Sequence, residues 1–475
     1  MREINQNDTI YKPVNLLCFK QTQISFEQLF KFLISLKFCN PIEREIKLTM
    51  KKIIFSLLGL FSFNLAAQEI YPEINSAAEE IEEQVISWRR DFHQNPELSN
   101  RETETAKKIA AHLKSLGIET TTGIAKTGVV GILKGGNEGK TVALRADIDA
   151  LPVTERNDLP FKSEVRTEFL GSETGVMHAC GHDTHIAIMM GVAEILSKNK
   201  DKINGTVKFI FQPAEEGPPP GEEGGASLMI KEGVLKNPDV DAIFGLHINS
   251  ETPVGTIKYK PEGTMAAVER FVINVKGKQT HGSAPWSGTD PILISAKIID
   301  GLQTIISRES KLVDAAAVIS VGKITSGIRF NIIPESAEMI GTIRTLDPDM
   351  KALILKRMND MVPAIAKAYG GEATVEIQNN TAITYNDPEL TSKMLPTLQK
   401  VAGKENVVLA KATTGGEDFS FFQEEIPGFY YFLGGKPLDS NEPAPHHTPD
   451  FFIDESGMLV GVKTMSQLAI DYLNQ

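Results

Sequence analysis

Three short apolar runs, each followed closely by acidic or metal-binding side chains, constrain the fold of this chain most strongly. Residues 141–144, 207–211 and 242–246 have the length and composition of buried strands. A helical pattern over 186–197 lies between the first two. This alternation predicts an α/β fold, with a mixed, mostly parallel sheet covered by helices on both faces. Sites in such sheets form beyond the carboxyl ends of the strands, where these polar residues stand.

The strongest pair of candidate metal ligands lies just upstream of the helix at 186–197. Cys180 and His182 are one residue apart, and Asp183 or Thr184 is expected to cap the helix. A thiolate and an imidazole together suit zinc. A free cysteine is more often a small buried apolar residue. The metal interpretation is preferred because other suitable donors are available elsewhere in the chain: Glu216, His247 and His447.

The adjacent carboxylates Glu215 and Glu216 predict a turn directly after the second strand. Successive strand side chains point to opposite faces, so both can reach one cavity only if the chain bends there. Pro213 favours such a bend. One carboxylate can then bind metal while the other accepts a proton from water. The alternative is a solvated acidic loop continuing into Glu222 and Glu223, which the apolar strand leading into the pair disfavours.

Four further polar residues are candidates for orienting the ligands. Asp147 and Asp149 would face the same way if the first strand continued, and Asp149 could orient a metal-bound histidine. A helix cap or a salt bridge with Arg145 is an equally good interpretation of this pair. His178 and His185 are expected to contact a ligand or a carboxylate near the site, or to be ordinary polar residues beside it.

Length and charge limit the classes of protein that are possible. A chain of 475 residues suggests two domains. Its 41% hydrophobic and 23% charged content is typical of a soluble globular protein. The net charge of −12 argues against nucleic acid or an anionic membrane surface as a partner. It does not restrict a small substrate, because a local site can be positive on an acidic protein.

The first 67 residues are not expected to belong to the fold. A basic start at 50–52 is followed by an apolar run over 53–65 and then by small residues. This pattern predicts a secretory signal peptide over 50–67, which is too short to span a membrane, and hence an exported protein. Residues 1–49 would then be an upstream extension from a misplaced start. A genuine cytoplasmic extension is the alternative.

The region 263–378 has a different order of elements. The order is strand, helix, strand, strand, helix, strand, which is the ferredoxin-like βαββαβ arrangement. It predicts a smaller domain inserted between two parts of the catalytic domain, at 70–262 and 379–475. The expected elements are strands at 271–276, 316–324, 337–345 and 373–377, and helices at 291–308 and 348–369.

Nine segments, in order, resemble the metal-dependent N-acyl-amino-acid amidohydrolases, which include hippurate hydrolase, the auxin-conjugate hydrolases and bacterial aminoacylases. They are spread over nearly all of the chain from residue 70 on. Together they are specific for this family but not for one substrate. The segments are WRRDFHQNPEL (88–98), LRADIDALPV (144–153), MHACGHDTH (177–185), FQPAEEG (211–217), GLH (245–247), GKQTHGSAP (277–285), RFNIIPESAEMIGTIRT (329–345), GGEDFS (415–420) and HHTPDF (446–451).

The resemblance implies two bound divalent ions, zinc or manganese, with cobalt as a further option. Glu215 would be the general base, and Asp149 would orient a ligand. His447 is preferred to His446 as a ligand, and Cys180 would bridge the two ions. The full ligand set that the resemblance implies is Cys180, His182, Glu216, His247 and His447.

The resemblance also assigns roles within the smaller domain. His281 would stabilise the developing oxyanion, often from the partner subunit of a homodimer formed through this lid domain. Asn331 and Arg344 would hold the substrate carboxylate, for which an arginine fork is geometrically suited. Without the resemblance, His281 would be interpreted as an ordinary histidine in a Gly/Ser/Pro turn.

The chain departs from the family pattern in two places. Asn95 stands where relatives often carry histidine, so a contact near the site is expected to be missing. The loop 217–225 (GPPPGEEGG) is longer than the usual Gly-rich link after the paired glutamates. Its prolines stiffen a loop beside the site and would narrow the substrate pocket.

The function expected from these observations is hydrolysis of the amide bond of a small N-acyl amino acid. A dipeptidase or carboxypeptidase on the same scaffold is the nearest alternative. A binding protein without turnover needs ligands but no base, so Glu215 argues against it. A thiol redox protein is disfavoured because Cys180 has no second cysteine to resolve a disulfide after signal removal.

Overall fold

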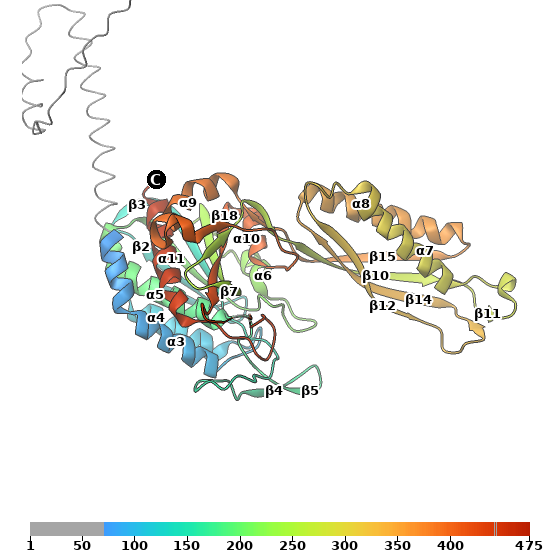
Figure 1. The fold of residues 1–475 in the computed structure, drawn as a ribbon, viewed down its shortest axis with the longest axis horizontal. Helices are drawn as coiled ribbons and strands as arrows, with labels where there is room; N and C mark the ends of the chain where they lie inside the picture. Colours follow the sequence, from blue (N-terminus) through green and yellow to red (C-terminus); the bar gives the residue numbers. More distant parts are fainter. Residues whose placement is uncertain (1–70, 441, 443) are drawn as a thin grey trace, which may run out of the picture. The chain divides into compact units, whose positions relative to one another are not determined.

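A mixed eight-stranded sheet forms the larger part of the fold (Figure 1). The structure is a computed structural model that describes residues 71–440, 442 and 444–475. The expected signal peptide and upstream extension lie outside these residues. The four central strands, β6, β3, β7 and β18, are parallel to one another, as predicted, while β2 and β8 pair antiparallel on either side of them. In spatial order the sheet contains β1 (Glu119–Ile124), β2 (Gly128–Lys134), β6 (Asn204–Gln212), β3 (Asn137–Asp147), β7 (Ala242–Pro253), β18 (Gly428–Lys436), β8 (Ile257–Tyr259) and β17 (Val407–Leu409).

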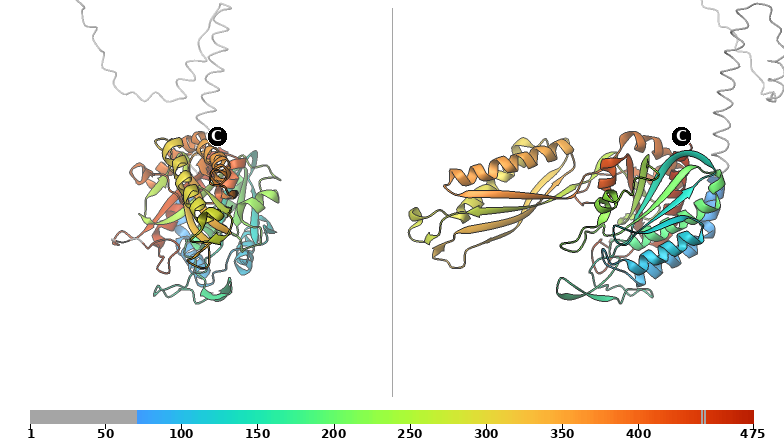
Figure 2. Two further views of the ribbon diagram at one scale, coloured as in Figure 1. Left: turned by 90° about the vertical axis from the view of Figure 1, so that its right-hand side faces the viewer. Right: turned by 180° about the vertical axis from the view of Figure 1, so that it is seen from behind.

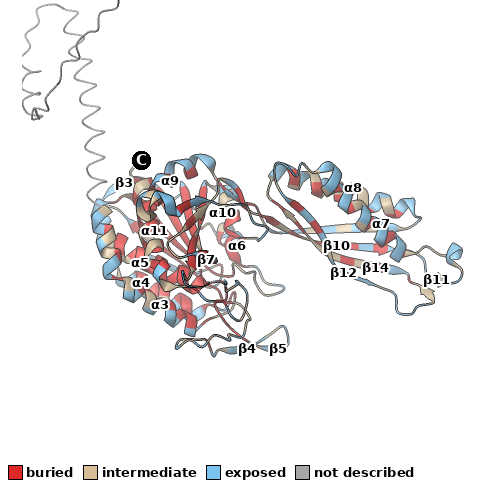
Figure 3. Ribbon diagram, viewed as in Figure 1, coloured by how far each residue is buried: buried red, intermediate tan, exposed pale blue. Residues whose placement is uncertain are grey.

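Both faces of this sheet are buried. Alternate residues of β3 face opposite sides, so Val142 and Leu144 join one apolar cluster while Ala143 joins another. Helices α3 (Glu82–Gln94), α4 (Thr103–Ser115), α5 (His182–Lys198), α9 (Pro388–Ala402) and α11 (Met458–Leu473) contribute to the first cluster. Helices α6 (Gly225–Lys231) and α10 (Phe419–Glu425) contribute to the second. Figure 3 shows the buried residues gathered in these strands and on the inner faces of the helices.

The start of α5 differs from the prediction. The helix begins at His182, so Asp183 and Thr184 lie inside its first turn and neither caps it. Its N-cap is Gly181, whose φ of 91° falls in the left-handed region. A Cβ at this position would lie 2.4 Å from Ile248. Glycine therefore allows the chain to turn sharply between Cys180 and His182 against the neighbouring strand.

The smaller sheet has four antiparallel strands in the order β12, β14, β10, β15. Helices α7 and α8 pack on one face of it and share a separate apolar core with its strands (Figures 1 and 2). The elements follow the predicted βαββαβ order. They are β10 (Ala267–Lys276), α7 (Pro291–Thr304), β12 (Ala317–Ser326), β14 (Ser336–Thr345), α8 (Pro348–Ala368) and β15 (Glu372–Thr381).

Three small antiparallel pairs complete the described elements. The pair formed by β11 and β13 carries His281 and follows the last residues of β10. Residues 71–80 are helical as well, and a turn at Ile81 separates them from α3. The pairs are β4 (Arg166–Phe169) with β5 (Ser172–Gly175), β9 (Glu262–Met265) with β16 (Thr384–Asn386), and β11 (Thr280–His281) with β13 (Ile332–Ile333).

Candidate metal centre and active site

Cys180 lies at the centre of a cluster of imidazoles. Its Sγ is 3.2 Å from Nε2 of His447, 3.4 Å from Nε2 of His247 and 3.7 Å from Nδ1 of His446. These residues come from the start of α5, from β7 and from the segment before α11. The carboxyl ends of neighbouring parallel strands meet at one edge of the sheet, which brings them together.

His182 and Glu216 face the same space from the other side. Nε2 of His182 lies 4.0 Å from Oε1 of Glu216, and that oxygen lies 3.0 Å from Nε2 of His447. Both Nε2 of His182 and Oε1 of Glu216 are buried and have no hydrogen-bond partner in the described part of the chain. A buried donor or acceptor without a partner is costly, and a bound cation would satisfy both atoms.

The donors form two overlapping groups that share the thiol. Cys180, His182 and His247 form one group, and Cys180, Glu216 and His447 form the other, with the ligand atoms of each within 4.8 Å of one another. The residues therefore fit two divalent cations with Cys180 between them. Thiolate, imidazole and carboxylate together suit zinc and related ions.

The protonation of the cluster without a cation is consistent with this fit. Burial lowers the pKa of His182, but Asp147 and Asp149 outweigh it and raise that pKa to about 10. Burial, with the Glu216 and Glu215 carboxylates nearby, raises the pKa of the Cys180 thiol. Cation binding would release these protons, because only the neutral imidazole and the thiolate are ligands.

Hydrogen bonds fix the ring orientation of two histidines. Nδ1 of His182 lies 2.9 Å from the carbonyl oxygen of Asp149 and 3.2 Å from its Oδ1. Nδ1 of His247 lies 2.5 Å from the carbonyl oxygen of Ile248. With each Nδ1–H donating, each Nε2 keeps its lone pair directed at the cluster. Oδ2 of Asp149 also accepts from Ser99 Oγ at 2.7 Å and from the Glu216 backbone N–H at 3.1 Å.

His185 supports the cluster without offering a free ligand atom. Its Nδ1 lies 2.5 Å from Oδ1 of Asp147, and its Nε2 accepts from the Ile248 backbone N–H at 2.8 Å. Its ring packs against that of His247, with 4.7 Å between centroids. His178 differs from the role expected for it, because neither of its ring nitrogens has a hydrogen-bond partner among the described residues. Burial lowers the pKa of His178 to about 4, so it is neutral.

The two adjacent histidines near the C-terminus have different surroundings. His447 approaches both Cys180 and Glu216 through Nε2 and has a left-handed φ of 60°. His446 instead accepts the Ser250 backbone N–H at its Nε2, at 3.1 Å. This geometry accords with the preference for His447 as a ligand.

Glu215 lies at the edge of the cluster, where its carboxylate is within 4.8 Å of the ligand atoms of His182 and Glu216. Strand β6 ends at Gln212, and Ala214 has a φ of 54°, so the chain turns where the paired carboxylates predict. Oε2 of Glu215 lies 3.9 Å from Nε2 of His182. Burial, followed by the nearby charges of Glu417, Glu216 and Asp418, raises the pKa of Glu215. A carboxylate with a raised pKa next to a metal site is suited to accept a proton.

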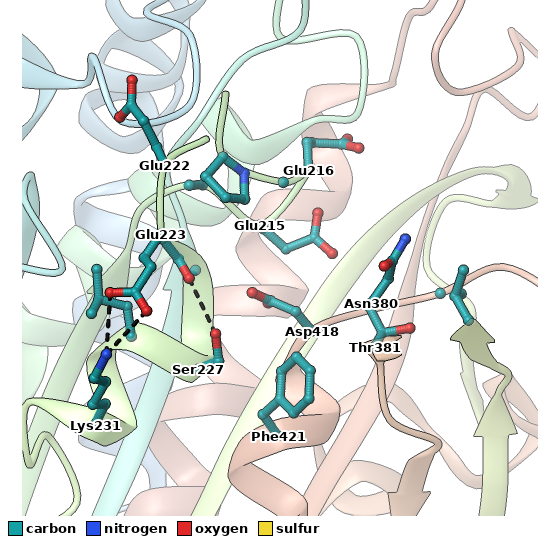
Figure 4. A pocket seen from close by; sticks show the side chains of 18 of the residues that line it. Glu215, Glu216, Glu222, Glu223, Ser227, Lys231, Asn380, Thr381, Asp418 and Phe421 are labelled. Carbon is teal, nitrogen blue, oxygen red and sulfur yellow. Dashed lines mark hydrogen bonds and ion pairs between the residues drawn. The ribbon is translucent and has the colours of Figure 1, made fainter. Parts of the chain in front are cut away.

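A cavity of about 780 Å³ opens beside Glu215 and Glu216 (Figure 4). Loop 217–225 and α6 form one wall, and Phe421 of α10 forms another. Residues at the ends of the smaller sheet's strands complete the lining: Val268, Arg344, Asn380 and Thr381. The Arg344 guanidinium makes one long hydrogen bond, 3.4 Å to the carbonyl oxygen of Thr414. A carboxylate in the cavity can therefore reach this cation.

His281 and Asn331 lie together at the opposite end of the smaller sheet from Arg344. Gly282 N–H donates to the Asn331 carbonyl oxygen at 2.8 Å, beside the paired strands β11 and β13. His281 is exposed, and its Nδ1 accepts the Ser283 backbone N–H at 3.0 Å. No interaction given for the described residues joins His281 to the cluster around Cys180. Their assigned roles stay predictions.

Asn95 lies apart from the cluster, and its side chain bonds to a neighbouring turn of its own helix. Asn95 is exposed, and its side chain donates to the backbone carbonyl of Asp91 at 2.8 Å. It has no contact with the cluster. His93 is the buried residue of this segment, with Nδ1 2.9 Å from Asp183 and Nε2 3.1 Å from Glu155.

Sequence reasoning anticipated only one contact of a buried polar network near Glu215, the salt bridge between Arg145 and Asp147. The Arg145 guanidinium contacts Asp147 at 2.7 Å, Glu417 at 2.9 Å and Asp418 at 3.0 Å. Tyr430 donates its hydroxyl to Glu417 at 2.6 Å. The available signals were an arginine inside an apolar strand and the two acidic residues of GGEDFS, to which no role was assigned.

A mixed α/β sheet with clustered sulfur, nitrogen and oxygen ligands beside a partly buried carboxylate defines a metal-dependent hydrolase. Comparison with known protein families identifies the family of hydrolases. The chain belongs to peptidase family M20/M25/M40, whose family model matches residues 143–471.

Similar proteins and a similar crystal structure support this assignment. The chain is 41% identical to thermostable carboxypeptidase 2 of Saccharolobus solfataricus, over 86% of this chain and 100% of that protein. It is 38% identical to an N-acetylcysteine deacetylase of Bacillus subtilis, over 81% of this chain and 96% of that protein. The crystal structure of Bacillus subtilis YXEP, described as a dinuclear metal-binding peptidase of the M20 family, matches with a TM-score of 0.70 and 37% identity. That match covers 83% of this chain and 99% of the other.

In residues 71–440, 442 and 444–475, no helix combines the length and the apolar character that crossing a bilayer requires.

Proposed function

We propose that this protein hydrolyses the amide bond of N-acyl amino acids to a carboxylate and a free amino acid. The observation that carries the proposal is the thiol of Cys180, shared by two groups of metal ligands beside the partly buried carboxylate of Glu215. Metal ligands alone would serve a binding protein, but a base at the edge of the cluster serves hydrolysis.

Each residue has a defined part in the reaction. Cys180, His182, Glu216, His247 and His447 would hold two divalent ions, zinc or manganese, with cobalt as a further option. When bound, such ions polarise the substrate carbonyl and acidify water. Glu215 accepts a proton as water oxygen bonds to the acyl carbon. It then donates that proton to the nitrogen as the C–N bond breaks. Arg344 holds the carboxylate of the amino acid from the wall of the cavity.

The smaller sheet is proposed to act as a lid and to form a homodimer. His281 and Asn331 follow the ends of strands opposite to the end that carries Arg344. Strand β10 alone separates these ends by about 30 Å at 3.3 Å per residue. A second copy of the chain is thus the proposed source of the His281 and Asn331 that complete a site. In that role His281 stabilises the charge that develops on the carbonyl oxygen.

The central experiment measures turnover of a panel of N-acyl amino acids together with metal content. The variant Glu215→Gln keeps the ligands but removes the base, so metal content should stay unchanged while kcat falls roughly 10²–10⁴-fold. Glu138→Gln, an exposed residue on β3, is the matched control. Near-normal turnover by Glu215→Gln would contradict the proposed role of Glu215.

A dipeptidase or carboxypeptidase activity is the second candidate. It is supported by the 41% identity to a protein named a carboxypeptidase. Dipeptides and N-acetyl and N-benzoyl amino acids should therefore be compared side by side. A higher kcat/KM for dipeptides would favour this second candidate over the first.

Export is proposed from the signal pattern at 50–67, which lies outside the described residues. N-terminal sequencing of the protein recovered outside the cytoplasm should give a start directly after this segment. A protein recovered only from the cytoplasm and beginning at Met1 would contradict the proposal.

A further inference from the structure

Asp418 contacts both ends of the segment that carries the proposed base. Its Oδ1 accepts from the Gln212 side chain at 2.7 Å, and its Oδ2 accepts from the Ala226 backbone N–H at 2.8 Å. Gln212 is the last residue of β6, and Ala226 lies at the start of α6. Everything between them, including Glu215, Glu216 and loop 217–225, is thus fixed at both ends by one buried carboxylate.

The close approach of Asp418 depends on a glycine. Gly225 has a φ of 69°, and a Cβ at this position would lie 2.5 Å from Oδ2 of Asp418. On its other side, Oδ1 of Asp418 accepts from the Arg145 guanidinium at 3.0 Å. The buried guanidinium of Arg145 therefore fixes Asp418, and Asp418 in turn fixes the segment between Gln212 and Ala226.

The outer part of the same segment is fixed by a second carboxylate. Glu222 contacts Arg101 at 2.6 Å and Lys126 at 2.5 Å, and it accepts from the Asn100 side chain at 3.0 Å. Asn100 also donates to the backbone carbonyl of Glu223 at 3.0 Å. The Gly- and Pro-rich loop is thus tied to neighbouring segments at Glu222 and Glu223, and its prolines restrict its backbone further.

The loop and Arg344 belong to different walls of the cavity. In Figure 4, Glu222 and Glu223 lie on one side of Glu215, while Asn380 and Thr381 lie on the other, at the end of the smaller sheet. Arg344 belongs to that smaller sheet. With the amino-acid carboxylate on Arg344 and the amide at Glu215, the acyl group extends toward loop 217–225.

We propose that Asp418 is a positioning residue that fixes Glu215 and loop 217–225 together, and that this loop is the wall that selects the acyl group. The proposal rests on the proposed function for the identity of the substrate. The positioning itself rests on contacts that exist without substrate. An error of 1 Å in the position of a reacting group can cost about 10²-fold in rate, so fixing both ends of this segment matters for catalysis.

The test compares Asp418→Asn and Glu222→Gln with wild type, all loaded with metal. In Asp418→Asn, an amide N–H₂ facing the Ala226 N–H cannot accept its hydrogen bond. We expect kcat to fall roughly 10²-fold with unchanged metal content. We also compare kcat/KM for the N-acetyl and N-benzoyl derivatives of one amino acid. In both variants the preference for one derivative over the other should be roughly tenfold weaker than in wild type. In Glu222→Gln the change should lie more in KM than in kcat.

Exposed residues away from the site supply the controls. Asp201→Asn lies just before β6, at the end opposite to Glu215, and Glu138→Gln lies on β3. Both should leave kcat and the substrate ratio at wild-type values. If Asp418→Asn does not fold, Gly225→Ala replaces it, because the added Cβ pushes directly against Oδ2 of Asp418.

Hydrogen–deuterium exchange of peptides covering 213–226 separates this proposal from the proposed function. Faster exchange there in Asp418→Asn, and unchanged exchange elsewhere, supports the positioning role even if the substrate is a dipeptide. Wild-type exchange in this segment would overturn it. So would wild-type kcat and substrate ratio in a folded Asp418→Asn, or a loss of metal in proportion to activity.

Discussion

The two carboxylate oxygens of Asp149 hold three different groups in place. One oxygen faces Nδ1 of His182, and the other accepts from Ser99 and from the backbone of Glu216. Asp149 therefore orients one ligand directly and the other through the main chain. A contact of this kind also fixes which ring nitrogen of the histidine carries the proton.

Asp149→Asn should weaken metal binding without removing a ligand. Its amide can still face His182, but its N–H₂ cannot accept from the Glu216 N–H. We expect metal affinity to fall about 10–100-fold. Competition with a chelator, followed by metal analysis, measures this fall, and Asp201→Asn serves as the control. Equal affinity in the variant and wild type would show that Asp149 does not orient the ligands.

Sequence reasoning named the donors that the structure brings together better than it named the residues around them. Glu215 and Glu216 could be predicted to turn into one cavity, because a strand cannot direct adjacent side chains to the same side. The contact between Arg145 and Asp418 joins residues 273 positions apart, so no local pattern indicates it. The surroundings of Asn95 and His178 likewise depend on packing that spacing does not reveal.

At the scale of elements, a buried ion pair joins α3 to the first turn of α5. Nε of Arg89 lies 2.8 Å from Oδ2 of Asp183, and both side chains are buried. His93 contacts the same carboxylate at 2.9 Å. Burial raises the pKa of Asp183, but Arg89 and His93 outweigh it and depress that pKa strongly. The pair therefore fixes the end of the helix from which His182 projects.

Arg89→Met should destabilise the fold by about 3–5 kcal/mol near neutral pH, because it leaves Asp183 buried with less compensation. A folded pKa below the unfolded value contributes stability above the unfolded pKa of about 3.9, and that stability is lost as pH falls. The difference between the variant and wild type should thus shrink below about pH 4. Urea unfolding at several pH values measures it.

The neighbouring Arg90 gives a matched control. Arg90 is partly exposed and pairs with Glu455 at 2.5 Å. Arg90→Met should cost less than about 1 kcal/mol, because exposed ion pairs contribute little. If the two variants were equally stable, the buried pair would not be what secures α5.

Element order could largely be predicted, whereas several element boundaries, among them the start of α5, could not. The strands and helices of both sheets follow the expected sequence, because hydrophobic periodicity and Gly/Pro positions set them locally. The start of α5 was misplaced because Asp183 and Thr184 are good capping residues by type. Tertiary contacts with Arg89 and Ile248 instead place the boundary at Gly181.

At the scale of the whole molecule, metal removal should affect stability as well as activity. The proposed ligands come from β7, from α5, and from segments after β6 and before α11. A ligand that binds only the folded state stabilises it, by about 4 kcal/mol at a thousandfold excess over Kd. Treatment with a chelator should therefore lower the Tm, and zinc or manganese should restore it. An unchanged Tm would indicate that the cluster does not bind metal.

Mixing of two inactive variants tests whether sites are shared between chains. His281→Ala removes the proposed oxyanion contact, and Glu215→Gln removes the base. If His281 acts in the partner's site, a mixed dimer regains one intact site, so unfolding and refolding the two together should restore up to about a quarter of wild-type activity. Each variant refolded alone is the control. A mixture no more active than its parts would show that His281 acts in its own chain or not at all.

The cluster combines residues that precede the smaller sheet in the sequence, such as His247, with His447, which follows it. The His447 backbone N–H also donates to the Ala179 carbonyl at 2.8 Å, which ties the last ligand to the turn before Cys180. A ribosome must therefore add the 200 residues from His247 to His447, the smaller sheet included, before the last donor exists. If the chain is exported unfolded through a translocon, as proposed, it would bind both ions only in the compartment that it reaches.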